Sequence, residues 1–244
     1  MRDRFFVEGV HAVGDTLQLS DDDARKLTAV LRKATGDRVQ IVDSSGAAFA
    51  ATLRVDNRRV DAHLDERFDR GPVESPLGVT IAQGIPKGQK MDLIVEKCTE
   101  LGAAAFVPVR SFRVVGERTG EHKIERWQRI VKSAAQQSGR TAIPSVAPIA
   151  TWEQLIATFP QYDHVYLPWE LADPAELRAW LPGEIEHAER VLFIIGPEGG
   201  FSADEVEHAR AAGAKLISLG RRILRTETAG IAILAVLAYV RGEM

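Results

Sequence analysis

The sequence predicts a mixed α/β protein in which a small, strand-rich N-terminal domain precedes a larger domain built on a mostly parallel sheet. Three observations carry this prediction. Short apolar segments crowd residues 4–64, a charged segment with prolines follows at 65–76, and apolar strands then alternate with helix-length segments from residue 79 onward. We therefore expect two domains, residues 1–70 and residues 71–244.

The first domain is expected to hold several short strands and one helix. The helix begins after Ser20, a preferred N-cap residue, because three aspartates at 21–23 then occupy the first turn, where the helix dipole favours acids. Turn residues at 36–37 and 44–46 separate the strands. This pattern suggests a small barrel. The expected strands are Arg4–Val7, Thr16–Leu19, Arg38–Asp43, Ala47–Leu53 and Val60–Leu64.

The segment Asp65–Pro76 is charged, contains Gly71-Pro72 and Ser75-Pro76, and has almost no apolar residues. Such a composition cannot bury a face against a core, so we expect a linker here.

The second domain is expected to alternate strands with helices. Apolar stripes predict a helix over 91–101, with Gly102 as its C-cap, and a long helix over 124–139. Thr151 with Gln154 and Ser202 with Glu205 have the spacing of capping boxes, which mark two further helix starts. The expected strands are Val79–Ala82, Ala105–Val109, His164–Leu167, Val191–Ile195 and Leu216–Leu219.

The last predicted helix, from about Glu227 to Val240, is apolar nearly all round. A helix of this kind is expected to be buried on every side. Because it lies in the last part of the sequence, we expect it to pack against another subunit.

Composition excludes several classes of protein. A single cysteine among 244 residues cannot form an internal disulfide, and no apolar stretch reaches the ~18 residues of a membrane span. The charged start of the chain leads into no apolar signal segment, so we expect a cytoplasmic location. The six histidines show no paired spacing typical of metal ligands, so no metal is expected.

Net charge is −3, but the charge is unevenly distributed. Residues 110–140 hold eight basic and three acidic residues, a balance that suits contact with a polyanion as well as an ordinary solvated helix face. The eight are Arg110, Arg113, Arg118, Lys123, Arg126, Arg129, Lys132 and Arg140.

Three segments that follow predicted strands are candidates for a ligand site. They are 167–169, the glycine-rich 196–200 and the long 219–229. Ligands of parallel sheets bind outside the carboxyl ends of the strands, and glycines let a ligand approach the backbone closely. Neither a P-loop motif nor a Gly-x-Gly-x-x-Gly fingerprint after a strand is present, so the common nucleotide sites are not expected.

The segments IGPEGGFS (195–202) and LGRRILRTETA (219–229), in this order and spacing, resemble the ribosomal RNA small subunit methyltransferase E family, which belongs to the SPOUT class of knotted methyltransferases. The resemblance covers nearly the whole chain. It includes Val30-Leu31-Arg32 with Gly36-Asp37, Pro86-Lys87-Gly88, TELG (99–102) and QSGR (137–140). The sequence departs from the family pattern at Ser133, where an acid is usual.

The resemblance implies a fold and an activity. The first domain would be a PUA-like RNA-binding barrel, and the second a SPOUT domain whose C-terminal segment threads a trefoil knot. The protein would be a homodimer that uses S-adenosylmethionine to methylate N3 of one uridine near the 3′ end of 16S ribosomal RNA, in the small-subunit particle or as free RNA.

The resemblance also assigns site residues. Arg225, Glu198 and Glu227 would be catalytic: the arginine would stabilise a uridine anion, and a carboxylate would accept its proton. Glu198 and Glu227 have structural alternatives, as a helix cap and as a favourable charge at a helix start. The expected RNA contacts are Arg32, Lys87, Arg113 and Arg140. The expected cofactor contacts are Leu167, Gly196, Pro197, Gly199, Leu219, Gly220, Ile223, Leu224 and Thr228.

Two other functions stay open at this point. One is an RNA-binding or ribosome assembly factor that keeps the fold without the reaction. The other is a knotted methyltransferase that modifies another RNA, because the choice of target depends on dispersed RNA contacts.

Overall fold

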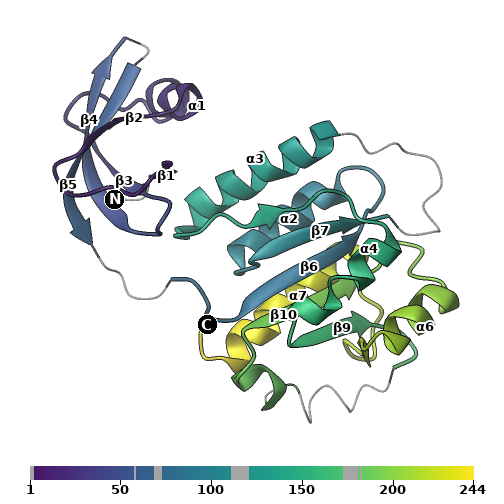
Figure 1. Cartoon of the computed structure of the whole chain (residues 1–244). Coiled ribbons are helices and arrows are strands. Elements are labelled where there is room, and N and C mark those ends of the chain that lie inside the picture. Colours follow the sequence, from purple (N-terminus) through teal and green to yellow (C-terminus); the bar gives the residue numbers. More distant parts are fainter. Residues whose placement is uncertain (1–2, 58, 69–72, 111–120, 173–180, 182) are drawn as a thin grey trace. The chain divides into compact units, whose positions relative to one another are not determined.

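The computed structural model describes residues 3–57, 59–68, 73–110, 121–172, 181 and 183–244. It divides into two compact units (Figure 1). The first comprises residues 1–74 together with 135–142, and the second comprises residues 75–134 and 143–244. The expected boundary at residue 70 thus differs from the observed one at Glu74, and the end of the predicted long helix belongs to the first unit.

The first unit contains a five-stranded sheet in the order β1-β3-β4-β5-β2. β1 pairs with β3 in parallel, and the other pairs are antiparallel. One apolar core, which includes Phe5, Leu27, Ile41, Phe49 and Leu64, lies against this sheet. The strands are β1 (Arg4–Phe6), β2 (Thr16–Gln18), β3 (Arg38–Val42), β4 (Ala48–Asp56) and β5 (Arg59–Phe68).

The predicted linker is wrong over its first residues. β5 continues to Phe68, and its last residues pair with Ala48–Ala50 of β4. Charged residues can form this part of the strand because pairing between strands uses backbone groups. Side chains such as Glu66 and Arg67 are exposed to solvent.

The helix of the first unit begins as expected. In α1 (Asp21–Arg25), the Ser20 hydroxyl accepts a hydrogen bond from the Asp23 N–H. A π-helical turn, Lys26–Val30, continues it. Arg32 follows with φ of 53°, in the left-handed region.

The second unit contains a six-stranded, wholly parallel sheet in the order β11-β9-β10-β6-β7-β8. The prediction of a parallel sheet is confirmed. Its strands are β6 (Gly78–Gly84), β7 (Ala105–Val109), β8 (Ser145–Val146), β9 (His164–Pro168), β10 (Arg190–Ile195) and β11 (Lys215–Ile217).

Helices cover both faces of this sheet (Figure 1). Alternate residues of β10 face opposite layers: Val191, Phe193 and Ile195 pack with α2 (Lys90–Glu100), α3 (Glu121–Ser138) and α7 (Thr226–Val240). Leu192 and Ile194 pack with α4 (Trp152–Ile156) and α6 (Ala203–Ala211). This alternation explains why β10 reads as an unbroken apolar run. A short 3₁₀ turn, η2 (Phe159–Gln161), follows α4.

The predicted helix ends are confirmed where they could be read locally. Both capping boxes form, at Thr151 and at Ser202. Gly102, the predicted C-cap of α2, has φ of 94°, a conformation that glycine adopts without strain, and Gly213 after α6 has φ of 105°.

Within this chain, α7 is buried on one face only, and packing of its other side against another subunit stays a prediction. A Cβ added to Gly230 would lie 3.0 Å from Cys98 Sγ and 3.2 Å from Ile195 Cδ1, so this glycine lets α7 approach α2 and β10 closely. Val236 and Tyr239, on the other side, are 47% and 75% exposed. Among the described residues, none of the helices has the length and apolar character that crossing a membrane requires.

Candidate active site

A cavity of about 560 Å³ lies in the second unit, at the carboxyl ends of β9, β10 and β11. Three loops and the start of α7 form its walls. Ligands of parallel sheets bind at this end of the strands. The loops are 168–172, 196–201 and 218–225. Nine residues predicted to act in catalysis or cofactor binding line this cavity: Gly196, Pro197, Glu198, Leu219, Gly220, Ile223, Leu224, Arg225 and Glu227.

The glycines of these loops permit very close backbone packing. A Cβ on Gly84, at the end of β6, would lie only 2.5 Å from Pro197 Cδ and 2.8 Å from its nitrogen. A Cβ on Gly196 would lie 3.2 Å from Gly200 Cα. Gly220 has φ of 111°, which other residues rarely adopt. The sequence therefore needs glycine here to shape the cavity wall.

A buried polar network joins three segments beneath the cavity. Gln83 Nε2 donates to Thr226 Oγ1 over 2.8 Å and to the Gly84 carbonyl over 2.9 Å. The Thr226 hydroxyl in turn donates to the Gly196 carbonyl over 2.5 Å. The end of β6, the loop after β10 and the first residue of α7 are thereby held together.

Three charged side chains meet at one side of the cavity. The Lys90 ammonium donates to Glu198 Oε1 over 2.8 Å and lies 3.6 Å from Glu227 Oε2. Burial alone would raise the pKa of Glu198, but hydrogen bonds from Lys90 and from the Lys87 N–H leave it below its usual range. The hydrogen bond to Glu198 raises the pKa of Lys90. This pair is therefore ionised at neutral pH.

Arginines provide the opposite charge on the loop after β11. Arg221, Arg222 and Arg225 all line the cavity and are exposed. Arg225 is the N-cap residue of α7, and its carbonyl accepts the Thr228 and Ala229 N–H groups. Its backbone is thus held in place while its side chain stays accessible.

Three predicted cofactor residues do not line the cavity. Leu167 is fully buried in the core under α4 and α6, because its position in β9 points its side chain away from the loop. Thr228 lies on the exposed side of α7, and Gly199 is absent from the lining as well. The lining also includes Trp169, Ser218 and Thr226, which were not among the predicted site residues although Trp169 and Thr226 lie in the predicted ligand segments.

The predicted RNA contacts differ in accessibility. Lys87 and Arg32 are both exposed. Arg113 lies outside the described residues. Arg126, within the positive stretch, forms an ion pair of 2.5 Å with Asp92, so part of that charge is neutralised.

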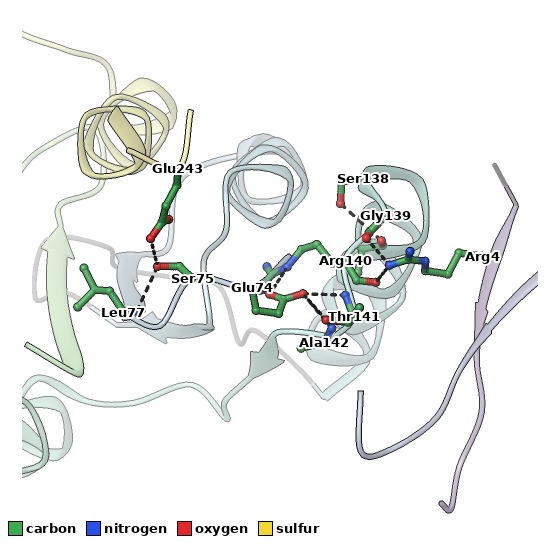
Figure 2. A network of polar contacts seen from close by, with 11 residues as sticks. Arg4, Glu74, Ser75, Leu77, Ser138, Gly139, Arg140, Thr141, Ala142 and Glu243 are labelled. Atoms are coloured by element: carbon green, nitrogen blue, oxygen red, sulfur yellow. Dashed lines mark hydrogen bonds and ion pairs between the residues drawn. The ribbon is translucent and has the colours of Figure 1, made fainter. Parts of the chain in front are cut away.

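Arg140 does not suit a phosphate contact, which corrects the prediction. Its side chain is 8% exposed, and its guanidinium donates to Glu74 through Nε over 3.0 Å and through a second nitrogen over 2.5 Å (Figure 2). Glu74 also accepts the Thr141 and Ala142 N–H groups. Arg4 donates to the carbonyls of Gly139 and Arg140. Arg140 is thus a structural residue of the first unit.

Comparisons with known proteins agree with this architecture. A family model described as RNA methyltransferase domain matches residues 73–238. Ribosomal RNA small subunit methyltransferase E of Bacillus subtilis is 30% identical over 230 residues, covering 92% of this chain and 90% of the relative. Its counterpart in Synechocystis is 36% identical over 234 residues, covering 95% and 76%.

Solved structures extend the similarity to three dimensions. The Neisseria gonorrhoeae methyltransferase of the same name, crystallised bound to S-adenosyl methionine, is 33% identical, with a TM-score of 0.87 and 98% of each chain covered. A methyltransferase from Legionella pneumophila in complex with the same cofactor is 29% identical, with a TM-score of 0.88. Sequence, fold and the glycine-walled cavity therefore agree that the chain belongs to the ribosomal RNA small subunit methyltransferase E family.

Proposed function

We propose that the chain transfers a methyl group from S-adenosylmethionine to N3 of a specific uridine in 16S ribosomal RNA. The observation that carries the proposal is the cavity at the carboxyl ends of β9, β10 and β11, where glycine-rich loops meet two carboxylates and an exposed arginine. Relatives over nearly the whole chain are named as methyltransferases of small-subunit ribosomal RNA.

The cavity fits the proposed cofactor. Its volume lies within the range of about 300–1,000 Å³ typical of small-molecule sites. Apolar side chains such as Trp169, Leu219 and Leu224 suit an adenine ring, while the glycine loops expose backbone groups to the ligand's polar atoms. When bound, S-adenosylmethionine supplies a methyl group on a positively charged sulfur.

The protein's contribution is chiefly to position two reactants, which can lower a barrier by up to ~7–11 kcal/mol. The N3 proton of uridine must leave before or during attack, and Glu198 and Glu227 are the carboxylates available to accept it. Arg225 lines the cavity and would stabilise the negative charge that the base then acquires.

The same loop favours a polyanionic substrate. Arg221, Arg222 and Arg225 are exposed beside the cavity, and Lys87 is exposed on the loop after β6. We assign phosphate contacts to Arg221, Arg222 and Lys87, and to Arg32 in the first unit; such contacts position RNA without reading its sequence. Arg113 stays a proposal that rests on the family resemblance alone.

Substitution of Arg225 separates an effect on the rate of methyl transfer from an effect on ligand binding. We expect Arg225→Ala to slow single-turnover methyl transfer on the order of a hundredfold at saturating RNA and cofactor, with cofactor affinity near normal. Single-turnover kinetics paired with calorimetry would measure both quantities. A folded variant that binds both partners and reacts at the parental rate would remove Arg225 from the mechanism.

The proposal as a whole is tested by incubating the protein with S-adenosylmethionine and small-subunit particles, followed by mass spectrometry of the nucleosides. We expect N3-methyluridine. Binding of neither the cofactor nor its demethylated product would favour an assembly factor without catalysis, while a different modified nucleoside would reveal another RNA target.

Finer features of the fold follow from the same proposal. We propose that the first unit is a PUA-like RNA-binding domain, since its sheet and single helix resemble that arrangement in content. The loops that meet at Thr226 and Gly196 are proposed to form a trefoil knot. The exposed apolar side of α7 supports a homodimer. A substrate in ribosomal RNA implies a cytoplasmic location.

A further inference from the structure

Lys90 forms ion pairs with both cavity carboxylates, Glu198 and Glu227. Neither the family motifs nor the proposed function gives this lysine a role. It is the first residue of α2, and its ammonium nitrogen lies 2.8 Å from Glu198 Oε1 and 3.6 Å from Glu227 Oε2. One cation thus connects the loop after β10 with the first turn of α7. All three side chains line the cavity.

The two carboxylates differ in how far they are already engaged. Glu198 accepts the Lys90 ammonium, and both of its oxygens also lie within hydrogen-bond distance of the Lys87 N–H, at 3.2 and 3.3 Å. Within the part of the chain that the structure describes, no backbone N–H group donates to Glu227. Its Oε2 is shielded from solvent and, among the described residues, has no hydrogen-bond partner, since 3.6 Å to Lys90 is an ion-pair distance.

This difference in hydrogen bonding indicates different roles for Glu198 and Glu227. Oε2 of Glu227, which lacks a hydrogen-bond partner among the described residues, lies 3.6 Å from the Lys90 ammonium, and the side chain retains 15% exposure where it lines the cavity. Glu198 instead joins the loop after β6 to the loop after β10. Buried carboxylate oxygens normally accept a hydrogen bond, so the unpartnered Oε2 of Glu227 indicates a missing donor.

We infer that Lys90 is a positioning residue of this active site: it holds Glu198 as a latch between two loops and orients Glu227 to accept a hydrogen bond from the base that is modified. The inference rests on the proposed function, because the base's N–H is the partner assigned to Glu227. It selects Glu227 over Glu198 as the carboxylate that meets the substrate.

The charge in the cavity affects the relative affinity for the methyl donor and its demethylated product, which can be measured without turnover. Lys90 partly neutralises two carboxylates, and S-adenosylmethionine carries one more positive charge than its demethylated product. Without the ammonium, the cavity should favour the cationic donor over the neutral product by about threefold to tenfold, as expected for unit charges roughly 8–10 Å apart in a partly solvated site.

Lys90→Met removes the charge and keeps most of the side-chain volume. Lys97→Met is the matched control: Lys97 lies on the same helix, is 38% exposed against 37% for Lys90, and also pairs with two carboxylates, Glu96 and Glu100, away from the cavity. Lys90→Arg tests rescue by charge, and Glu227→Gln tests the partner. Thermal melting establishes that each variant is folded.

We expect Lys90→Met to slow single-turnover methyl transfer on the order of tenfold to a hundredfold at saturating RNA and cofactor, without loss of RNA affinity. Lys90→Arg should recover part of the rate, and Lys97→Met should match the parent. The double variant Lys90→Met/Glu227→Gln should be little slower than Glu227→Gln alone, because the lysine acts through that carboxylate. Calorimetry should show an increased preference for the methyl donor over its demethylated product in Lys90→Met but not in Lys97→Met.

Three results would overturn the inference while the parent protein remains active. These are a parental rate in Lys90→Met, full additivity in the double variant, or an equal loss of affinity for donor and product, which would mean that Lys90 only supports loop shape. A parent protein that binds no donor and transfers no methyl group would instead overturn the proposed function, and the inference with it.

Discussion

Arg32 adopts a backbone conformation that arginine rarely takes, with φ of 53°. Left-handed backbone in a residue other than glycine stores strain, and such strain gathers at functional sites. We predict that Arg32→Gly raises the free energy of unfolding by about 0.5–1 kcal/mol and weakens RNA binding, with the salt dependence reduced by roughly one phosphate contact. Chemical denaturation and RNA titration at several salt concentrations would measure these effects.

Asn57 supplies the matched control. It has φ of 54° in the same unit, at the turn between β4 and β5, and has no predicted RNA role. Asn57→Gly should change stability by no more than a few tenths of a kcal/mol, since asparagine tolerates this conformation, and should leave RNA affinity unchanged. Equal RNA affinity in both variants would contradict the assignment of Arg32.

Gly84 tests how tightly the cavity wall is packed. A Cβ there would overlap Pro197, at 2.5 Å from Cδ and 2.8 Å from the backbone nitrogen, so the loop after β10 would have to move. We predict that Gly84→Ala lowers the free energy of unfolding by about 1–3 kcal/mol and weakens cofactor binding at least tenfold. Denaturation and calorimetry would test both effects.

Gly183 is the control for that substitution. It lies in a helical turn with no atom within 4 Å of an added Cβ. Gly183→Ala should therefore be neutral or stabilise by up to about 1 kcal/mol. Normal cofactor affinity in Gly84→Ala would show that the loop tolerates displacement.

At the scale of elements, the turn that follows α3 is held by Glu74. This carboxylate binds the Arg140 guanidinium and the backbone N–H groups of Thr141 and Ala142 (Figure 2). Burial raises its pKa, but these contacts outweigh burial and lower the pKa from its ordinary 4.5. A depressed carboxyl pKa stabilises the fold fully above the ordinary value, and this stabilisation is lost as the pH falls through the lower, folded-state value.

We predict that Glu74→Gln lowers the free energy of unfolding at pH 7 by about 3 kcal/mol, because Arg140 is left buried without its counter-ion. The difference from the parent should shrink as the pH falls below 4.5. Glu66→Gln is the control: Glu66 is 68% exposed in the same unit, and its loss should cost less than about 1 kcal/mol. A pH-independent gap between parent and Glu74→Gln would refute this account.

At the scale of the whole molecule, the apolar side of α7 bears on assembly. Val236 lines a small apolar groove with Leu219, Ala232 and Ile233, and Tyr239 nearby is 75% exposed. We predict that Val236→Glu dissociates the proposed dimer, as a charge cannot be desolvated cheaply in an apolar interface. Sedimentation at micromolar concentration would show the change.

Val10→Glu provides the comparison, because Val10 is 75% exposed in the first unit and carries no predicted interface role. It should sediment as the parent does. A parent protein that is monomeric at high concentration and fully active would exclude the dimer.

Much of the fold could be predicted because its signals are local. The Ser20, Thr151 and Ser202 caps act within three residues along the chain, and the apolar alternation of β10 reflects its own two faces. The glycine-rich segment 196–200 and the segment 219–229 were also identified from sequence, because they follow predicted strands. These features depend on neighbours in the chain, and a linear sequence records neighbours directly.

The missed and mistaken residues depend on partners far away in sequence. Lys90 meets Glu198 across 108 residues, Gln83 meets Thr226 across 143, and Arg140 meets Glu74 across 66. A lysine or arginine looks alike in sequence whether it faces solvent, phosphate or a buried carboxylate. Only the folded chain brings the partner within hydrogen-bond distance, and that distance, together with burial, decides whether the charge binds a ligand or holds the structure.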